Sequence, residues 1–425
     1  MRSIRGAAFS VRAGLGPSAP TWVLMQQLVV RGLVAVKFLA LGRILGPSAI
    51  GSVSIALLGV AIAESLSDTG LPQAVIQGTN APTRSELAAV WTTLATRGLL
   101  VALLLIALAP VMNSQFHLGN ALVLLQLAAA LPLIRGVASP AYYVVQRNRG
   151  FQHIAGIEIA AAFVDCCTGL AFAFGGAGAY SLLIGMIVGE TLKSTLTWAT
   201  MKPRPPIRAA WSGIGHYIGF SRWIWAGSVV NLLLNQFDKV VVGKLLGPAQ
   251  LGAYQMSSKL AQMLLTDAAF AMGQYLFPTF SAQHRHDARV AARLVKLYLV
   301  IVACGLTMFV VLLRMTAEPL FALILGPAWM SAVPLFKIFV INMAIGALIA
   351  VLVAYLRAVG DAKATTHASL IQMVILFAIV PPATHYWGVT GIAWSMTVGM
   401  GSAAMWMLYR TLRRHDDPAA KKWTP

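Results

Sequence analysis

The chain has 425 residues, of which 58% are hydrophobic and only 11% charged, and its mean hydropathy is +0.75. Soluble domains carry about 25% charged residues, so this composition excludes a soluble protein. The net charge of +19 could indicate a nucleic-acid partner, but the placement of the basic residues argues against one.

Apolar stretches of about 20 residues recur along the chain, and each is long enough to cross a hydrocarbon core of ~30 Å as a helix. In the first half, the predicted spans are 22–41, 48–66, 86–110, 119–139, 153–174 and 179–200. In the second half, they are 218–241, 249–275, 294–314, 332–356, 366–386 and 389–410. The sequence therefore predicts an all-α polytopic membrane protein with about twelve transmembrane helices.

The basic residues of the connectors gather on one side of the membrane in this arrangement. The opposite side collects only Arg43 and Lys244. Short basic loops stay cytoplasmic, so we expect both termini to face the cytoplasm. The bases then meet cytosol and anionic lipid headgroups, which explains the net charge with membrane lipids as partners and without nucleic acid.

A ten-residue motif occurs twice: GRILGPSAIG at 42–51 returns as GKLLGPAQLG at 243–252. Each half has an even number of predicted spans, so the repeat is parallel, with a pseudo-two-fold axis along the membrane normal. We expect two six-helix lobes, residues 1–205 and residues 206–425, the second with a short cytoplasmic tail. The Gly-Pro pair within each copy predicts a tight outer turn between the first two helices of each lobe.

Several charged residues fall deep inside the predicted spans. Arg31 and Arg97 lie roughly 14–16 Å from the membrane surface at 1.5 Å per residue, near the midplane. A charge there costs several kcal/mol unless it faces a wet cavity or a partner. Lys37 is closer to the outer face, where its stem is expected to reach the headgroups.

Two helices of the second half carry polar side chains at helical spacing. One stripe contains Gln255, Lys259, Gln262 and Thr266, and the other contains Ser228, Asn231, Asn235 and Asp238. Such a stripe must face protein or water, as an interhelical hydrogen-bond seam or as the wall of a cavity. The lysine in the first stripe favours a cavity.

Acidic residues also occur within the predicted spans. Glu190 and Lys193 are three positions apart on one helix and are expected to form an ion pair. Two interpretations of Glu64 and Asp165 remain open: coupling of transport to a cation through a buried carboxylate, or neutralisation of nearby bases. No loop offers a paired carboxylate with a histidine, a metal-spaced His/Cys set or a nucleophile elbow, so no catalytic site, metal or cofactor is expected.

Four segments carry a resemblance to a known family, and it extends over nearly the whole chain. They are residues 41–47 (LGRILGP), 67–71 (SDTGL), 146–151 (QRNRGF) and 237–248 (FDKVVVGKLLGP). With these motifs the chain resembles the Wzx-type oligosaccharide flippases, the polysaccharide-transporter branch of the MOP (multidrug/oligosaccharidyl-lipid/polysaccharide) superfamily.

The resemblance implies a MATE-like fold that works by alternating access in the bacterial inner membrane. The implied substrate is an undecaprenyl-pyrophosphate-linked oligosaccharide repeat unit, destined for surface polysaccharide. The resemblance also implies polysaccharide polymerase and export proteins as partners. The pyrophosphate would need cationic groups in a low-dielectric cavity. The candidate substrate-binding residues are Arg31, Arg97, Lys259, Gln255, Gln262, Asn231 and Asn235.

Two other functions compete with this one. A multidrug or cation antiporter of the same superfamily would rely on Glu64, Asp165 and Glu158, and the excess of deep bases argues against it. A membrane-embedded glycan polymerase or ligase typically needs a large extracytoplasmic loop, and the predicted outer connectors are too short. The chain is therefore expected to be a transporter and not an enzyme.

Overall fold

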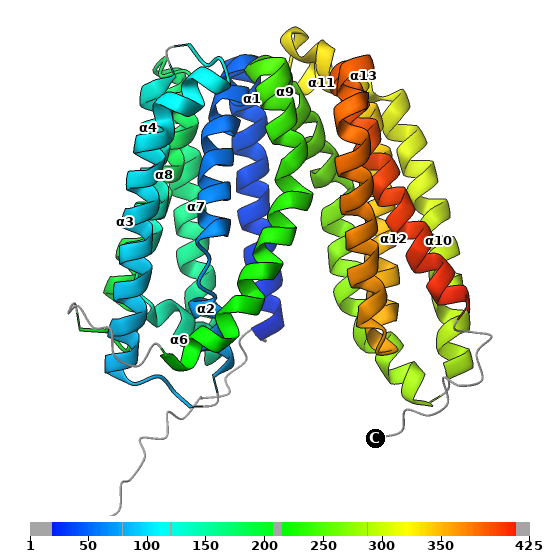
Figure 1. Ribbon diagram of the computed structural model, residues 1–425, viewed down its shortest axis with the longest axis horizontal. Helices are drawn as coiled ribbons and strands as arrows, with labels where there is room; N and C mark the ends of the chain where they lie inside the picture. The colour runs from blue at the N-terminus through cyan, green and yellow to red at the C-terminus, as the bar shows by residue number, and fades with distance from the viewer. Residues whose placement is uncertain (1–18, 79, 120, 207–214, 287, 414–425) are drawn as a thin grey trace, which may run out of the picture.

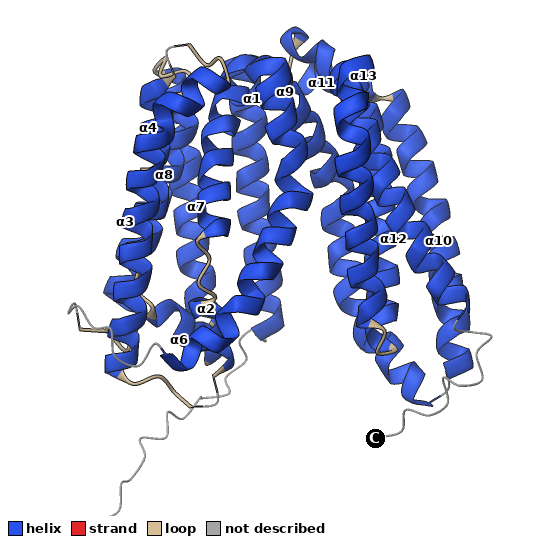
Figure 2. Ribbon diagram, viewed as in Figure 1, coloured by secondary structure: helices blue, strands red, loops and turns tan. Residues whose placement is uncertain are grey.

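The computed structural model describes residues 19–78, 80–119, 121–206, 215–286 and 288–413, and the regular secondary structure of these residues is all helical, with loops and turns between the helices (Figure 2). The terminal segments expected to face the cytoplasm, 1–18 and 414–425, lie outside this described part. The elements in chain order are α1 (Ala19–Leu66), α2 (Leu71–Gln77), α3 (Arg84–Gln115), α4 (Leu122–Ala128), α5 (Ala130–Val137), α6 (Ala141–Arg147), α7 (Phe151–Phe174), α8 (Tyr180–Thr200), α9 (Gly215–His286), α10 (Ala288–Met315), α11 (Ala317–Ile324), the 3-10 helix η1 (Pro327–Ala332), α12 (Val333–Ala358) and α13 (Ala362–Arg413).

The two copies of the repeated motif form matching breaks in α1 and α9. Gly46 has φ 74° and ψ 174°, and Gly247 has φ 82° and ψ 176°. Only glycine adopts this region readily, and the following proline has no amide hydrogen to place in a preceding turn. Both predicted turns are confirmed. Figure 1 shows α9 rising to the upper end of the molecule and returning from it.

Six helical segments of the described chain are long and apolar enough to cross a membrane, so this is a multi-pass membrane protein. They are Trp22–Leu66, Arg84–Gln115, Phe151–Phe174, Val290–Met315, Pro327–Ala358 and Lys363–Arg413. Leu122–Val137 and Ala141–Arg147, bent by 60°, supply a seventh if they count as one span. Non-helical glycines interrupt two of these segments, at Gly46 in α1 and at Gly388 in α13.

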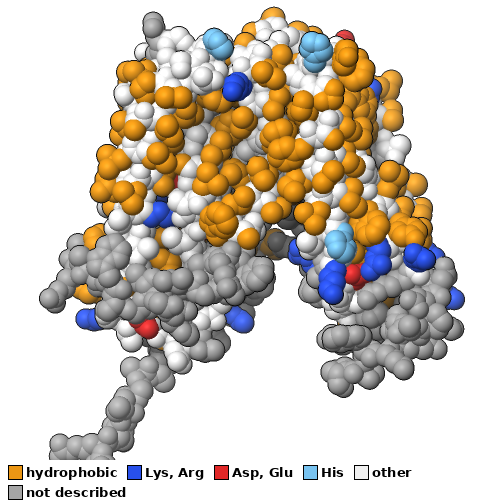
Figure 3. Space-filling model, in the orientation of Figure 1, with side chains coloured by type: hydrophobic (Ala, Val, Ile, Leu, Met, Phe, Trp, Pro, Cys, Tyr) orange, Lys and Arg blue, Asp and Glu red, His pale blue; other side chains and the backbone are white. Residues whose placement is uncertain are grey.

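The helices form two groups that meet at the upper end and separate at the lower end (Figure 1). One group contains α3, α4, α7 and α8, the other contains α10, α12 and α13, and α1 and α9 lie between them. The space-filling view shows the molecule hollowed between the groups at the lower end (Figure 3). Lys and Arg side chains gather near that end, whereas the flanks are mainly hydrophobic, as lipid contact requires (Figure 3).

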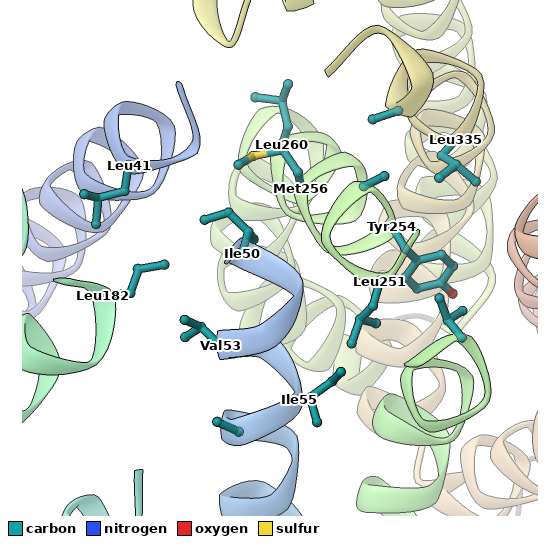
Figure 4. Packing of buried hydrophobic residues seen from close by; sticks show 14 of the residues in the cluster. Leu41, Ile50, Val53, Ile55, Leu182, Leu251, Tyr254, Met256, Leu260 and Leu335 are labelled. Atoms are coloured by element: carbon teal, nitrogen blue, oxygen red, sulfur yellow. The ribbon is translucent and has the colours of Figure 1, made fainter. Parts of the chain in front are cut away.

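The buried core has the same asymmetry. One large cluster joins both halves of the chain, with Ile50 and Ile55 of α1 on the side that faces Leu251 and Met256 of α9 (Figure 4). The four smaller clusters each stay within one half. Leu71 and Ile154 belong to the two clusters of the first half, and Phe280 and Leu356 to the two clusters of the second. Among the described residues, the large cluster is therefore the one in which apolar packing joins the two halves.

The first length of α9 also contacts the first half of the chain. The Trp225 indole donates a hydrogen bond to the Leu66 carbonyl oxygen (2.8 Å), and the Ser228 hydroxyl donates to Asp68 Oδ2 (2.7 Å). These bonds hold α9 against the connection between α1 and α2.

Candidate functional site

A cavity of about 300 Å³ lies within the first half of the chain, between α1, α2, α3, α5 and α6. Its volume is in the range of small-ligand sites. It is lined by Glu64, Ser65, Asp68, Pro72, Leu94, Arg97, Gly98, Val101, Pro132, Arg135, Gly136 and Tyr143.

Two arginines reach this cavity because α3 and α5 pack very closely. A Cβ atom on Gly98 would lie 2.5 Å from the Pro132 carbonyl oxygen, and one on Gly136 would lie 2.7 Å from that of Leu94. Such distances leave no room for a side chain, so these glycines permit backbone-to-backbone contact, as small residues do between membrane helices. Each glycine follows an arginine in the sequence, and the contact therefore places Arg97 and Arg135 on one cavity.

Arg135 is held between two carboxylates from different helices. Its Nη1 lies 3.0 Å from Glu64 Oε2 on α1, and its Nε lies 3.0 Å from Glu190 Oε1 on α8. All three side chains are partly buried, with 36%, 27% and 24% exposed for Arg135, Glu64 and Glu190. Charge-assisted bonds of this kind fix both partners, so Arg135 ties three helices together.

Arg97 binds neutral oxygens instead. Its Nε donates to Ser67 Oγ (3.0 Å), and its Nη2 donates to the backbone carbonyl oxygen of Glu64 (2.6 Å). It forms no ion pair with any residue that the structure describes. Its guanidinium is thus oriented by the protein while its charge is not matched by a directly bound carboxylate.

Two other ion pairs of the first half, Lys37–Asp165 and Lys193–Glu158, differ from what the sequence predicted. Lys37 is buried and lies 2.5 Å from Asp165 Oδ1, so its predicted reach to the headgroups is wrong. Lys193 pairs with Glu158 (2.7 Å) and not with Glu190, because α5 brings Arg135 to Glu190. The contact with Arg135 from a neighbouring helix thus prevails over the three-residue spacing that favoured a Glu190–Lys193 pair within α8.

The predicted substrate-binding residues on α9 do not line this cavity. Gln255, Lys259 and Gln262 are partly buried, and Lys259 Nζ donates to Gln262 Oε1 (3.3 Å). The side chain of Thr266, the last residue of that predicted stripe, lies outside the described residues. Asn235 donates to the exposed Asn231 through Nδ2 (2.7 Å to Oδ1).

The residues of the second predicted stripe, which runs from Ser228 to Asp238, do not share one exposed face. Asp238 is 3% exposed and accepts a hydrogen bond from the buried Tyr254 (2.6 Å), whereas Ser228 binds Asp68. Arg31 is exposed on α1. Of the predicted site residues, the cavity brings together Arg97 and Glu64.

Among the polar residues that line the cavity, sequence reasoning missed four: Ser65, Asp68, Arg135 and Tyr143. A usable signal was present, because Arg-Gly occurs both at 97–98 and at 135–136 inside apolar spans. No group of three or more His, Cys, Asp or Glu side chains within the described ranges is arranged to hold a metal ion.

Comparison with known proteins identifies the family. Residues 40–334, well over half of the chain, match a family model described as "Polysaccharide biosynthesis protein". The chain belongs to this family. It is 24% identical over 353 residues to the succinoglycan biosynthesis transport protein ExoT of Rhizobium meliloti, covering 83% of this chain and 71% of the relative. It is 21% identical over 325 residues to the lipopolysaccharide biosynthesis protein WzxC of Escherichia coli, covering 76% and 65%.

Solved structures share its fold. The lipid II flippase MurJ in an inward closed conformation superimposes with a TM-score of 0.70 at 12% identity, covering 91% of this chain and 87% of MurJ. An inward-facing multidrug MATE transporter of the MOP superfamily gives 0.61 at 13% identity, covering 96% and 100%. The resemblance to Wzx-type flippases is confirmed, as is the expectation of a transporter and not an enzyme.

Proposed function

We propose that this protein moves an undecaprenyl-pyrophosphate-linked oligosaccharide repeat unit from the inner to the outer leaflet of a bacterial inner membrane. Two lobes, residues 1–205 and 206–425, would alternate access to the space between them. The breaks in α1, α9 and α13 support a count of about twelve spans, six in each lobe. The basic lower end supports a cytoplasmic position for both termini.

The observation that carries the proposal is the state of Arg97. A diphosphate needs cationic hydrogen-bond donors in a place shielded from water, where charge–charge attraction is strong. Arg97 is oriented by two neutral oxygens and keeps its charge for a ligand. Arg31 and Lys259 would supply further positive charge. Gln255, Gln262, Asn231 and Asn235 would meet sugar hydroxyls, which both donate and accept hydrogen bonds as amides do.

The paired acids argue against the rival cation antiporter. Glu64, Asp165 and Glu158 are bound to Arg135, Lys37 and Lys193, respectively. A hydrophobic cation would have to displace a built-in base at each position. Glu64 and Asp165 remain the proposed sites for coupling transport to an ion or to the membrane potential, because both acids lie within membrane helices.

A complementation assay tests the function. A bacterial strain lacking its own repeat-unit flippase would receive this chain or the variants Arg97→Ala and Arg97→Lys, and surface polysaccharide would be measured. We expect rescue by the unsubstituted chain and loss with alanine. Lysine should restore little, because it lacks the planar fork that binds phosphate through two parallel bonds.

The matched control is Arg84→Ala, at the exposed first turn of the same helix, which should rescue like the parent. Equal rescue by both Arg97 variants would remove this residue from the site. Drug resistance conferred by the unsubstituted chain, without rescue in strains carrying several different glycans, would establish the antiporter instead.

A further inference from the structure

The repeated motif forms a reciprocal contact between the two halves of the chain at their closed upper end. A Cβ atom on Gly51 of the first copy would overlap the Pro248 carbonyl oxygen of the second copy. A Cβ on Gly252 of the second copy would overlap the Pro47 carbonyl oxygen of the first. Each of these added atoms would also lie 3.0 Å from the amide nitrogen of the opposite glycine. We refer to these four residues as the glycine crossing.

The glycine crossing places backbone against backbone, so it tolerates no side chain at either glycine. Carbonyl oxygens of a helical turn cannot withdraw as the tip of a flexible side chain can. The contact joins α1 and α9, which both belong to the cluster of buried residues that unites the halves. It therefore exists only while the upper end is closed, and parting the halves there would break it.

One polar contact from the same motif adds to this closure. The Arg43 guanidinium donates to the carbonyl oxygens of Leu323 and Ile324, at the last residues of α11 in the opposite half. The final carbonyls of a helix lack partners within the helix and carry partial negative charge, so a guanidinium suits them.

The basic residue at the equivalent position of the second copy, Lys244, makes no such bond to helix-terminal carbonyl oxygens among the described residues. Lys244 is exposed and hydrogen-bonds to no group in the described part of the chain. The two halves thus share the glycines but differ in the basic residue, which offers a matched comparison within one molecule.

We propose that the glycine crossing and Arg43 form a latch that holds the upper end shut and sets how often it opens. The sequence repeats the motif because the contact needs the same small residue from both halves. Adding a methyl group at either glycine should destabilise the closed arrangement while leaving the open one unaffected. The consequence for transport rests on the proposed alternating access, but the latch itself can be measured without any glycan.

A labelling experiment tests the latch. The three native cysteines are replaced by serine, and Met256→Cys is introduced as the reporter. Met256 is fully buried, and its Cε lies against Gly42 of the other half. A membrane-impermeant maleimide is applied to spheroplasts and, separately, to inverted membrane vesicles. The reporter should be labelled from the outer side only when the upper end opens.

We expect Gly51→Ala and Gly252→Ala each to raise the labelling rate in spheroplasts by about tenfold, a shift of ~1.4 kcal/mol in the closed–open equilibrium. The controls Gly32→Ala and Gly227→Ala, where an added Cβ meets nothing within 4 Å, should leave it unchanged. Should the alanine variants fail to fold, Arg43→Gln keeps the test open. It should raise labelling roughly threefold, and Lys244→Gln should not.

The other labelling outcomes each support or overturn the latch. Unchanged labelling in the glycine variants and in Arg43→Gln would overturn the latch. An equal rise in spheroplasts and vesicles would indicate general loosening and would also overturn it. A rise confined to vesicles would support the latch and reverse the proposed orientation. Raised labelling in spheroplasts, in a chain that rescues no flippase-deficient strain, would keep the latch and remove the proposed function.

Discussion

Arg97 meets Glu64 through the backbone and not through an ion pair: Arg97 Nη2 donates to the Glu64 carbonyl oxygen at 2.6 Å. The Glu64 carboxylate turns instead to Arg135, which it shares with Glu190. The two arginines of one cavity therefore have different tasks. Arg135 is paired with two carboxylates, whereas Arg97 binds only neutral oxygens and is the residue that we propose for a ligand.

The first prediction separates these tasks by stability. Arg135→Gln leaves two partly buried carboxylates without their cation, and removing one partner of such a group costs about 3 kcal/mol or more when burial is complete. Because these groups are partly exposed, we expect about 2 kcal/mol, seen as a lower melting temperature of the purified protein in detergent. Arg97→Gln should change the melting temperature little while abolishing transport.

A charge-balancing variant checks the reason for that loss. Adding Glu64→Gln and Glu190→Gln to Arg135→Gln removes the repulsion and should recover most of the lost stability. Lys337→Gln serves as the control, because its partner Glu318 is 66% exposed and such surface pairs contribute about 0.5 kcal/mol. If Arg135→Gln proved as stable as this control, the three-residue cluster would have no structural role.

The second prediction concerns the contact between α3 and α5. Gly98→Ala places a methyl group 2.5 Å from the Pro132 carbonyl oxygen, which is backbone and cannot move aside alone. Overpacking of this kind costs about 1–3 kcal/mol, and it should also separate the two arginines and lower transport. Gly156→Ala on α7, where an added Cβ meets nothing, should behave like the parent in both the melting and the complementation assays.

The sequence was sufficient for those features that depend on local chemistry. Gly46-Pro47 and Gly247-Pro248 predict their turns, since positive φ and a missing amide hydrogen are properties of the residues themselves. Arg97 could be found because a charge inside an apolar span is conspicuous.

Ion-pair partners on different helices could not be predicted from the sequence in this way. Nothing in the spacing of the residues shows that α5 places Arg135 next to Glu190. Because Arg135 pairs with Glu190, Lys193 pairs with Glu158 instead. Likewise, Lys37 reads as a residue near the membrane surface until α7 supplies Asp165. Depth along one helix follows from counting residues, but the facing helix depends on packing between segments that are distant in the sequence, 55 residues for Arg135 and Glu190 and 128 for Lys37 and Asp165.

The third prediction tests that Lys37–Asp165 pair with a double-mutant cycle. The lysine side chain is 7% exposed and the aspartate 19%, so either charge alone would be poorly solvated. Lys37→Met and Asp165→Asn should each lower stability by about 3 kcal/mol, and the double variant should lose less than the sum. Additive losses in the melting temperature would mean that the two side chains do not interact.

The fourth prediction concerns Asp238, a polar residue of α9 whose stripe was expected to face protein or water and which the structure places in the core. Its carboxylate accepts a hydrogen bond from the Tyr254 hydroxyl at 2.6 Å, and both side chains are buried. Tyr254→Phe keeps the ring packed edge-on against Phe339 but removes the donor. A buried acceptor left without its partner costs about 1–3 kcal/mol, so the melting temperature should fall.

The matched change at the other partner distinguishes the hydrogen bond from the charge. Asp238→Asn retains an acceptor oxygen for Tyr254 and removes the cost of burying a carboxylate, so it should be less destabilising than Tyr254→Phe. Tyr142→Phe provides a reference, because Tyr142 donates to Glu158 (2.9 Å), which keeps Lys193 as a second partner. That variant should lose less stability than Tyr254→Phe. An equal loss in both would mean that burial of the Asp238 carboxylate adds nothing to the strength of its hydrogen bond.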